Sequence, residues 1–296
     1  MTEKAILFDS SRCSACKACQ VACKCWNGLP SPMETNSQEW SGTLQNPPDL
    51  NDNTRLIITF DEADNGKAYG VNWAFGRRAC MHCTDAGCVQ VCPSGALFKD
   101  EETGLVSYNK DKCIGCKYCA AACPFDVPRH IGSSFLGGET LINKCTGCLD
   151  RVRQDRAPAC VTTCQPGALR FGDRDEMIAI AEERVELLKS KGFDSARTYG
   201  VDEMGGCHVI HVLKYPIDQY ELPEKPELSP LVEVLEFMKP LAGVGTVALL
   251  GGLGLSFLTG IGYQRHKMRY DEVNHDIIDE ETGEVIRHID VEAGER

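Results

Sequence analysis

Cysteine spacing is the feature that most constrains what this 296-residue chain can fold into. Of its 18 cysteines, 16 fall into four groups of four. A secreted protein can hold this many cysteines in disulfides, but two cysteines only two residues apart in a tight turn seldom pair. Tight grouping therefore indicates metal ligation. Structural zinc usually takes two separated cysteine pairs and has no use for a third and fourth cysteine so close by.

The four groups share one pattern. The first and third have the spacing C-x2-C-x2-C-x3-C, the second widens one gap to four residues, and the fourth has an eleven-residue insert. They are Cys13, Cys16, Cys19 and Cys23; Cys80, Cys83, Cys88 and Cys92; Cys113, Cys116, Cys119 and Cys123; and Cys145, Cys148, Cys160 and Cys164. In bacterial ferredoxins with this spacing, the last cysteine ligates the cluster of the partner motif, so motifs act in pairs. Four motifs predict four 4Fe-4S clusters.

The segment between groups two and three indicates how the groups pair. Residues 96–98 and 105–108 flank a polar turn at 101–104, a pattern typical of a short hairpin. Cluster loop, hairpin and cluster loop is a ferredoxin layout, so groups two and three are expected to form an inner pair. Groups one and four then form an outer pair that encloses it. An internal repeat supports this, because PSGALF at 93–98 matches PGALRF at 166–171.

Several residues beside the cysteines have two interpretations. Lys17, Lys117 and Lys144 each stand next to a cysteine of a group, where a cation would offset cluster charge and raise its reduction potential; the alternative is a solvated loop lysine. His82 could donate to a sulfur or simply pack in its loop. The two cysteines left over are expected to be buried or idle thiols, since free cysteine packs as a small hydrophobe; they are Cys25 and Cys207.

The second half of the chain predicts an extension followed by an anchor. Residues 173–192 have the spacing of an amphipathic helix that starts at Asp173 and ends at Gly192, and 207–213 predicts a strand. Four prolines between 216 and 230 indicate a linker. Residues 240–264 contain no charged residue, which is long enough to span about 30 Å of hydrocarbon. A buried core helix is the alternative.

Charge patterning predicts the topology. Basic residues follow the apolar segment at 265–269, whereas Lys239 stands almost alone before it, so the C-terminus is expected in the cytoplasm and the cluster domain on the periplasmic side of the cytoplasmic (inner) membrane. A complex that faces the cytoplasm is the alternative. Residues 271–296 hold ten acidic residues against two arginines and so supply most of the net charge of −12; they predict a disordered tail. The rest is nearly balanced, which indicates no nucleic-acid partner.

The motifs resemble a known family. CKACQVAC at 16–23, CMHC at 80–83, CIGCKYC at 113–119 and CTGC at 145–148 are similar to the iron–sulfur (beta) subunits of membrane-bound molybdenum or tungsten enzymes. FGD at 171–173, the helix after it, residues 196–200, Gly205-Gly206 and the single apolar span resemble the respiratory formate dehydrogenase beta subunit in particular. The cysteine motifs alone are shared with dimethyl sulfoxide, nitrate and polysulfide reductases and with some hydrogenases.

The resemblance implies the ligands of each cluster. One cluster would be held by Cys13, Cys16, Cys19 and Cys164, and its neighbour by Cys23, Cys145, Cys148 and Cys160. The inner pair would be held by Cys80, Cys83, Cys88 and Cys123, and by Cys92, Cys113, Cys116 and Cys119.

The expected fold is α+β, with two ferredoxin-like subdomains, one inserted in the other, and a single C-terminal transmembrane helix. The expected parts are an outer subdomain at 1–75 and 140–172, an inner subdomain at 76–139, an extension at 173–230, an anchor at 231–265 and a tail at 266–296.

The chain has no visible nucleophile or nucleotide-binding loop, so it is expected to conduct electrons. By resemblance they would pass from formate oxidation at a molybdopterin-containing alpha subunit, through four 4Fe-4S clusters, to a cytochrome b-type gamma subunit in the lipid membrane and then to quinone. The alternatives are the equivalent subunit of a hydrogenase or reductase, and a zinc-stabilised scaffold.

Overall fold

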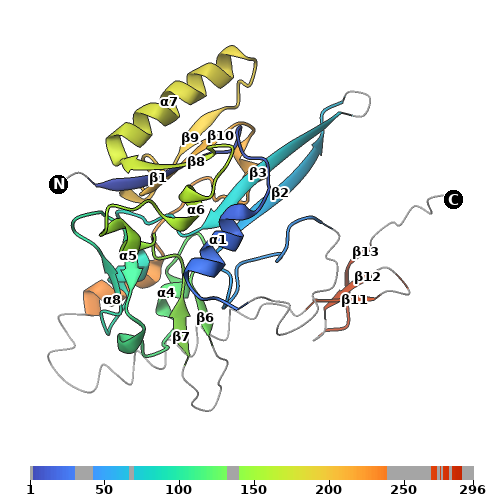
Figure 1. Cartoon of the computed structure of the whole chain (residues 1–296). Helices are drawn as coiled ribbons and strands as arrows, with labels where there is room; N and C mark the ends of the chain where they lie inside the picture. Colours follow the sequence, from blue (N-terminus) through green and yellow to red (C-terminus); the bar gives the residue numbers. More distant parts are fainter. Residues whose placement is uncertain are drawn as a thin grey trace. The chain divides into compact units, whose positions relative to one another are not determined.

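The computed structural model describes residues 3–30, 43–66, 70–131 and 140–238, and, near the C-terminus, 268–271, 274, 276–279 and 282–288. The chain divides into two compact units, Met1–Glu236 and Phe237–Arg296. Figure 1 shows the elements of each unit.

In the first unit the described strands are β1 (Lys4–Asp9), β2 (Leu56–Asp64), β3 (Val71–Ala79), β4 (Leu97–Lys99), β5 (Val106–Tyr108), β6 (Arg129–Ile131), β7 (Leu141–Asn143), β8 (Leu169–Asp173), β9 (Arg197–Tyr199) and β10 (Val209–Leu213). The α-helices are α1 (Ala18–Trp26), α3 (Gly87–Gln90), α4 (Tyr118–Ala121), α5 (Leu149–Val152), α6 (Ala159–Thr162), α7 (Arg174–Ser190) and α8 (Pro230–Met238). Short 3-10 turns are η1 (Lys110–Lys112), η2 (Glu203–Gly205) and η3 (Ile217–Tyr220).

A four-stranded sheet joins the two ends of the first unit. Its order is β8-β1-β10-β9, and β1 pairs with β10 in parallel, with Ile6 opposite Val209. Because side chains alternate across a strand, Ala5 and Leu7 of β1 face α7, whereas Ile6 packs in the larger core on the other side. Both faces of the central strands are therefore buried.

Helix α7 covers one face of this sheet (Figure 1). Met177, Ala181, Val185 and Leu188 recur at helical spacing and are buried against β1 and β10. The helix follows Asp173 and stops before Gly192, whose φ of 88° suits a residue without a side chain. The predicted helix at 173–192 and strand at 207–213 are confirmed, the strand as β10.

Three hairpins surround the cysteine loops. β4 and β5 form the hairpin predicted between groups two and three, with Leu97 opposite Tyr108. β6 pairs with β7, and β2 pairs with β3 along their full length. Figure 1 shows β2 and β3 reaching away from the helices as a long arm. This arm was not expected from the sequence, although its base is apolar and buried at Leu56, Ile57 and Ile58.

The predicted linker at 216–230 packs back on the first unit. Tyr220 is buried, and the Tyr199 hydroxyl donates to the Pro223 carbonyl oxygen at 2.7 Å. The predicted span at 240–264 lies outside the described residues. Within the part of the chain that is described, no helix is long and apolar enough to cross a bilayer, and α8 covers only the start of the expected anchor at 231–265.

The second unit contains a three-stranded antiparallel sheet of β11 (Met268–Asp271), β12 (Asp276–Asp279) and β13 (Val285–His288). This differs from the disordered tail expected from the acidic composition. The reason is local, because Ile277, Ile278 and Val285 supply β-branched residues between the acidic ones, and such residues favour strands.

Candidate metal centre

The same left-handed turn recurs in all four cysteine groups. The residue before the second cysteine has a positive φ in every group, at Ala15 (52°), His82 (51°), Gly115 (72°) and Gly147 (66°). In three groups the amide of this residue donates to the sulfur of the first cysteine at 3.4 Å, as from Ala15 to Cys13. In the third group the Ile142 amide donates to Cys113 instead, also at 3.4 Å. The turn thus holds the first sulfur next to a donor.

The last two cysteines of each group are held by a helix. The first cysteine of each C-x3-C pair lies in a helix, and the second lies either in the same helix, as in α1, or just beyond its C-terminal end, as at α3, α4 and α6. These pairs are Cys19 and Cys23 at α1, Cys88 and Cys92 at α3, Cys119 and Cys123 at α4, and Cys160 and Cys164 at α6. α1 contacts α6, and α3 contacts α4.

One cavity brings together four thiols from groups one and four. Cys13, Cys16, Cys19 and Cys164, here called set one, line this cavity. Burial raises the pKa of Cys13 to about 11 and that of Cys19 to about 12, and the charges of nearby thiols of this set add to the effect. Cys16 is exposed, so this set reaches the surface.

A second cavity lies among groups two and three. It is lined by set four, which is Cys92, Cys113, Cys116 and Cys119. Burial, and then the charges of the other three thiols, raise the pKa of Cys119 to about 12. His130 Nε2 lies 3.7 Å from the Cys119 sulfur, and Cys116 is exposed.

The remaining eight thiols form two interior sets. Set two is Cys23, Cys145, Cys148 and Cys160, and set three is Cys80, Cys83, Cys88 and Cys123. Burial raises the pKa of Cys23, and the charges of the other three members of set two raise it further. Burial likewise raises the pKa of Cys123 to about 12, with Cys80 and Cys83 as its thiol neighbours. The structure thus brings together the same fours that the resemblance implied; their role as ligands stays a prediction.

The thiol sets fit a cluster better than a single ion. Among the described residues, no three histidine, cysteine or acidic side chains converge closely enough to hold one metal ion. Zinc would need its ligands about 2.0 to 2.3 Å from one point. Thiols that line a cavity are suited to a cluster of several irons, each bound by one sulfur.

Lys144 is the one buried cation of the three lysines considered. Its ammonium donates to the carbonyl oxygens of Val106 at 2.7 Å and Cys145 at 2.8 Å, and lies 3.7 Å from the Cys80 sulfur. Burial lowers the pKa of Lys144, but the thiolates around it outweigh this and hold the pKa above its usual value. By contrast, Lys117 is exposed. Lys17 is half-buried, over the Phe60 ring at 5.2 Å.

His82 and Cys207 are both buried next to residues of the thiol sets. His82 is fully buried and its Nδ1 accepts from the Val106 amide at 3.0 Å, whereas its Nε2 has no hydrogen-bond partner among the described residues. Both interpretations of His82 stay open. Cys207 is buried, as expected, but it lies in a β-bridge opposite Cys83. A hydrogen bond between the two thiols is the largest cause that raises the pKa of Cys83. Cys25 is exposed.

Fold and thiols together define the class of the protein. An α+β chain with four cysteine motifs of this spacing is an iron–sulfur protein of the dicluster ferredoxin type. Models of the 4Fe-4S dicluster domain match residues 12–97 and 71–174.

Known relatives narrow the class. The chain is 38% identical over 280 residues to the nitrate-inducible formate dehydrogenase iron-sulfur subunit of Escherichia coli K12, which covers 93% of this chain and 90% of the relative. It is 39% identical to the formate dehydrogenase iron-sulfur subunit of Haemophilus influenzae, over 86% of this chain and 78% of the relative. The hydrogenase-2 operon protein HybA of Escherichia coli O157:H7 is 32% identical, over 76% of this chain and 74% of the relative. The chain belongs to the family of formate dehydrogenase iron–sulfur subunits, and the resemblance read from its motifs is confirmed.

Proposed function

We propose that the chain relays electrons, through four 4Fe-4S clusters, from a molybdopterin-containing formate dehydrogenase subunit to a cytochrome b-type membrane subunit and the quinone pool. Sets one to four would each hold one cluster, with the cysteines named above as ligands. Family membership supports the formate partner, and sixteen thiols in four sets of four support the number of clusters. Sets one and two combine cysteines of the first and fourth groups, and sets three and four combine cysteines of the second and third groups. This arrangement also supports two subdomains, one inserted in the other.

The linear order of the thiol sets is the observation that carries this proposal. Sets one and two share α1 and α6, and sets three and four share α3 and α4. Sets two and three meet at Lys144, which lies beside both Cys145 and Cys80. Only the two end sets have an exposed cysteine, Cys16 in set one and Cys116 in set four. A line of sites that opens to the surface at both ends suits a relay between two partners.

We also propose that residues 231–265 anchor the chain in the cytoplasmic membrane, with the cluster domain on the periplasmic side and the C-terminus in the cytoplasm. The uncharged segment at 240–264 and the basic residues that follow it support this topology. Its glycines suit close packing against the helices of a membrane partner.

The test is to tag the C-terminus, extract the native complex in mild detergent and identify the co-purifying large subunit by mass spectrometry. A molybdopterin subunit of the formate dehydrogenase type is expected, together with a cytochrome b-type subunit. A nickel–iron hydrogenase subunit would instead favour the role suggested by the relative HybA, and would overturn formate as the electron source.

A further inference from the structure

Arg77 is a buried cation for which the protein supplies no acceptor. It lies in β3 and is 2% exposed, yet its Nε and both terminal nitrogens lack a hydrogen-bond partner among the described residues. A guanidinium carries five N–H donors and a permanent charge. Burying such a group without a partner strongly destabilises the folded chain, so an acceptor that is not a side chain is indicated.

The groups around Arg77 identify where that acceptor lies. Arg77 stands directly opposite Ile58 in the β2–β3 hairpin, so the two side chains lie on the same face, and Ile58 lines the cavity of set one. Helix α1, which contacts both β2 and α6, carries Cys19 of set one and Cys23 of set two. The Arg77 charge acts on the thiols of Cys19 and Cys160, in agreement with this placement. His211 also lies near it, and burial, followed by the Arg77 charge, lowers the His211 pKa to about 3. A neutral histidine cannot balance the guanidinium. The clusters that sets one and two would hold are the anions available on this side of β3.

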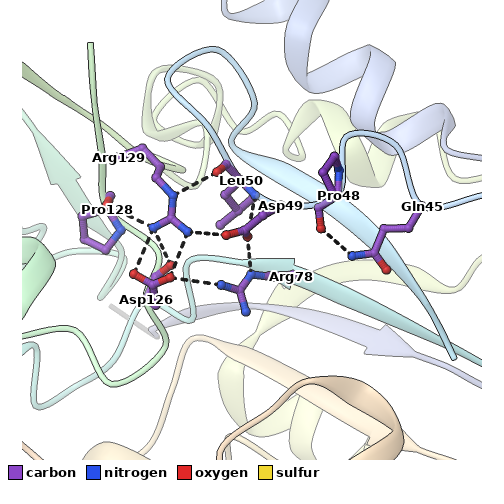
Figure 2. Close-up of polar contacts among 8 residues, drawn as sticks. All are labelled: Gln45, Pro48, Asp49, Leu50, Arg78, Asp126, Pro128 and Arg129. Atoms are coloured by element: carbon purple, nitrogen blue, oxygen red, sulfur yellow. Dashed lines mark hydrogen bonds and ion pairs between the residues drawn. The ribbon is translucent and has the colours of Figure 1, made fainter. Parts of the chain in front are cut away.

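Arg78, the next residue along the chain, differs from Arg77 in having carboxylate partners. Arg78 projects from the opposite face of β3, since side chains alternate along a strand. It forms ion pairs with Asp49 at 2.9 Å and Asp126 at 3.3 Å. Figure 2 shows these pairs together with Arg129, which contacts the same two carboxylates. The fold therefore pairs one arginine with carboxylates and leaves its neighbour without any.

We propose that Arg77 is a countercharge shared by the first and second clusters, to whose sulfurs it donates hydrogen bonds, and that it selectively raises the reduction potentials of these two. This rests on the proposed function. Each cluster would accept one electron from its neighbour and pass it on, and Arg77 would stabilise the added negative charge, because a nearby cation acts strongly in a low-dielectric interior. Arginine stays protonated throughout, so no proton accompanies the electron.

The experiment uses the complete complex, purified without oxygen, and follows each cluster by electron paramagnetic resonance while the potential is varied. Arg77→Gln is expected to lower the midpoint potentials of two of the four clusters and to leave the other two unchanged. Arg78→Gln, the matched control, should leave all four unchanged. Lys144→Gln should lower a different pair, sharing one cluster with the Arg77 pair, because Lys144 lies between sets two and three.

A second variant keeps the proposal open to refutation. Arg77→Lys retains the charge with a different donor geometry, and should hold all four clusters with smaller shifts in the same two. Unchanged potentials in a four-cluster Arg77→Gln protein, equal shifts of all four, or loss of clusters in the lysine variant would each overturn the proposal. Fewer than four clusters in the unmodified chain would instead overturn the proposed function.

Discussion

Single residues in a left-handed conformation shape the loops that carry the thiols. The position before the second cysteine needs a positive φ in all four groups, and for a residue with a side chain this costs about 1 to 2 kcal/mol. Glycine meets the requirement in groups three and four, whereas Ala15 and His82 meet it at a cost. The turn is kept in each group because it places an amide or a neighbouring strand against the first sulfur.

Ala15 offers a direct test of this requirement. Ala15→Gly should retain the first cluster and leave stability unchanged or slightly raised, since glycine adopts a positive φ without strain. Ala15→Val should lower the iron content by about four atoms per chain, because a β-branched residue strongly disfavours this conformation. Iron and acid-labile sulfide per chain are the measurements. Equal iron in the valine and glycine variants would contradict the argument.

The sequence predicted how the cysteines group far better than it predicted which charged residues are buried beside them. The spacing of cysteines is local, so it indicated ligand chemistry and the pairing of groups without any tertiary information. Burial is not local: Lys144 precedes Cys145 much as Lys117 follows Cys116, yet only Lys144 is buried. Arg77 was missed for the same reason. Its only signal is an Arg-Arg pair that interrupts an otherwise alternating strand.

At the scale of elements, local patterns predicted α7, β10 and the β4–β5 hairpin, but not the sheet that joins them. β10 pairs in parallel with β1, about two hundred residues earlier in the chain, and no short window of sequence contains that pairing. The β2–β3 arm was missed because Asp61, Glu62 and Asp64 make its outer half resemble a polar loop. The arm is nevertheless a hairpin, because all nine residues of β2 pair with β3 in one continuous register.

The packing of α7 can be tested apart from the thiols. Leu188→Ala should lower the free energy of unfolding by about 2 to 5 kcal/mol, because Leu188 is buried between α7 and the sheet. The neighbouring Leu187 is 42% exposed, so Leu187→Ala should change the free energy of unfolding by less than about 0.5 kcal/mol. Denaturant unfolding measures both. Iron content should stay unchanged in either variant, because α7 covers the sheet face opposite the thiol core; loss of iron on Leu188→Ala would contradict this.

The arginine network of Figure 2 fastens the loop at 45–50 to the hairpins. Arg129 donates to the carbonyl oxygens of Leu50 at 2.9 Å and Asp126 at 2.7 Å, and pairs with the Asp49 carboxylate at 2.9 Å. Arg129→Lys should lower the free energy of unfolding by about 1 to 3 kcal/mol, since lysine lacks the planar fork that reaches these acceptors together. Asp49→Asn should cost less, about 1 kcal/mol at most, because the pair is partly exposed. Thermal unfolding would rank them; the reverse order would contradict this interpretation.

For the whole chain, composition and motifs predicted an α+β protein with dicluster domains, which fold and comparisons bear out. The membrane anchor stays a prediction that depends on hydropathy alone. A joint Leu249→Arg and Leu250→Arg change should release the chain from membranes, because each arginine at the centre of a span costs about 2.5 to 3.5 kcal/mol. The paired alanine change should keep it in the membrane pellet. Retention of the arginine variant after detergent-free washing would refute the span.

Formate-driven reduction of the native complex tests the central claim most directly. The complex, isolated without oxygen, would be treated with formate and frozen, and Mössbauer spectroscopy would count its clusters and their oxidation states. We predict about sixteen iron atoms in this chain, all in 4Fe-4S clusters, and reduction of those clusters by formate. Fewer clusters, or clusters that stay oxidised with formate and become reduced with hydrogen, would contradict the account.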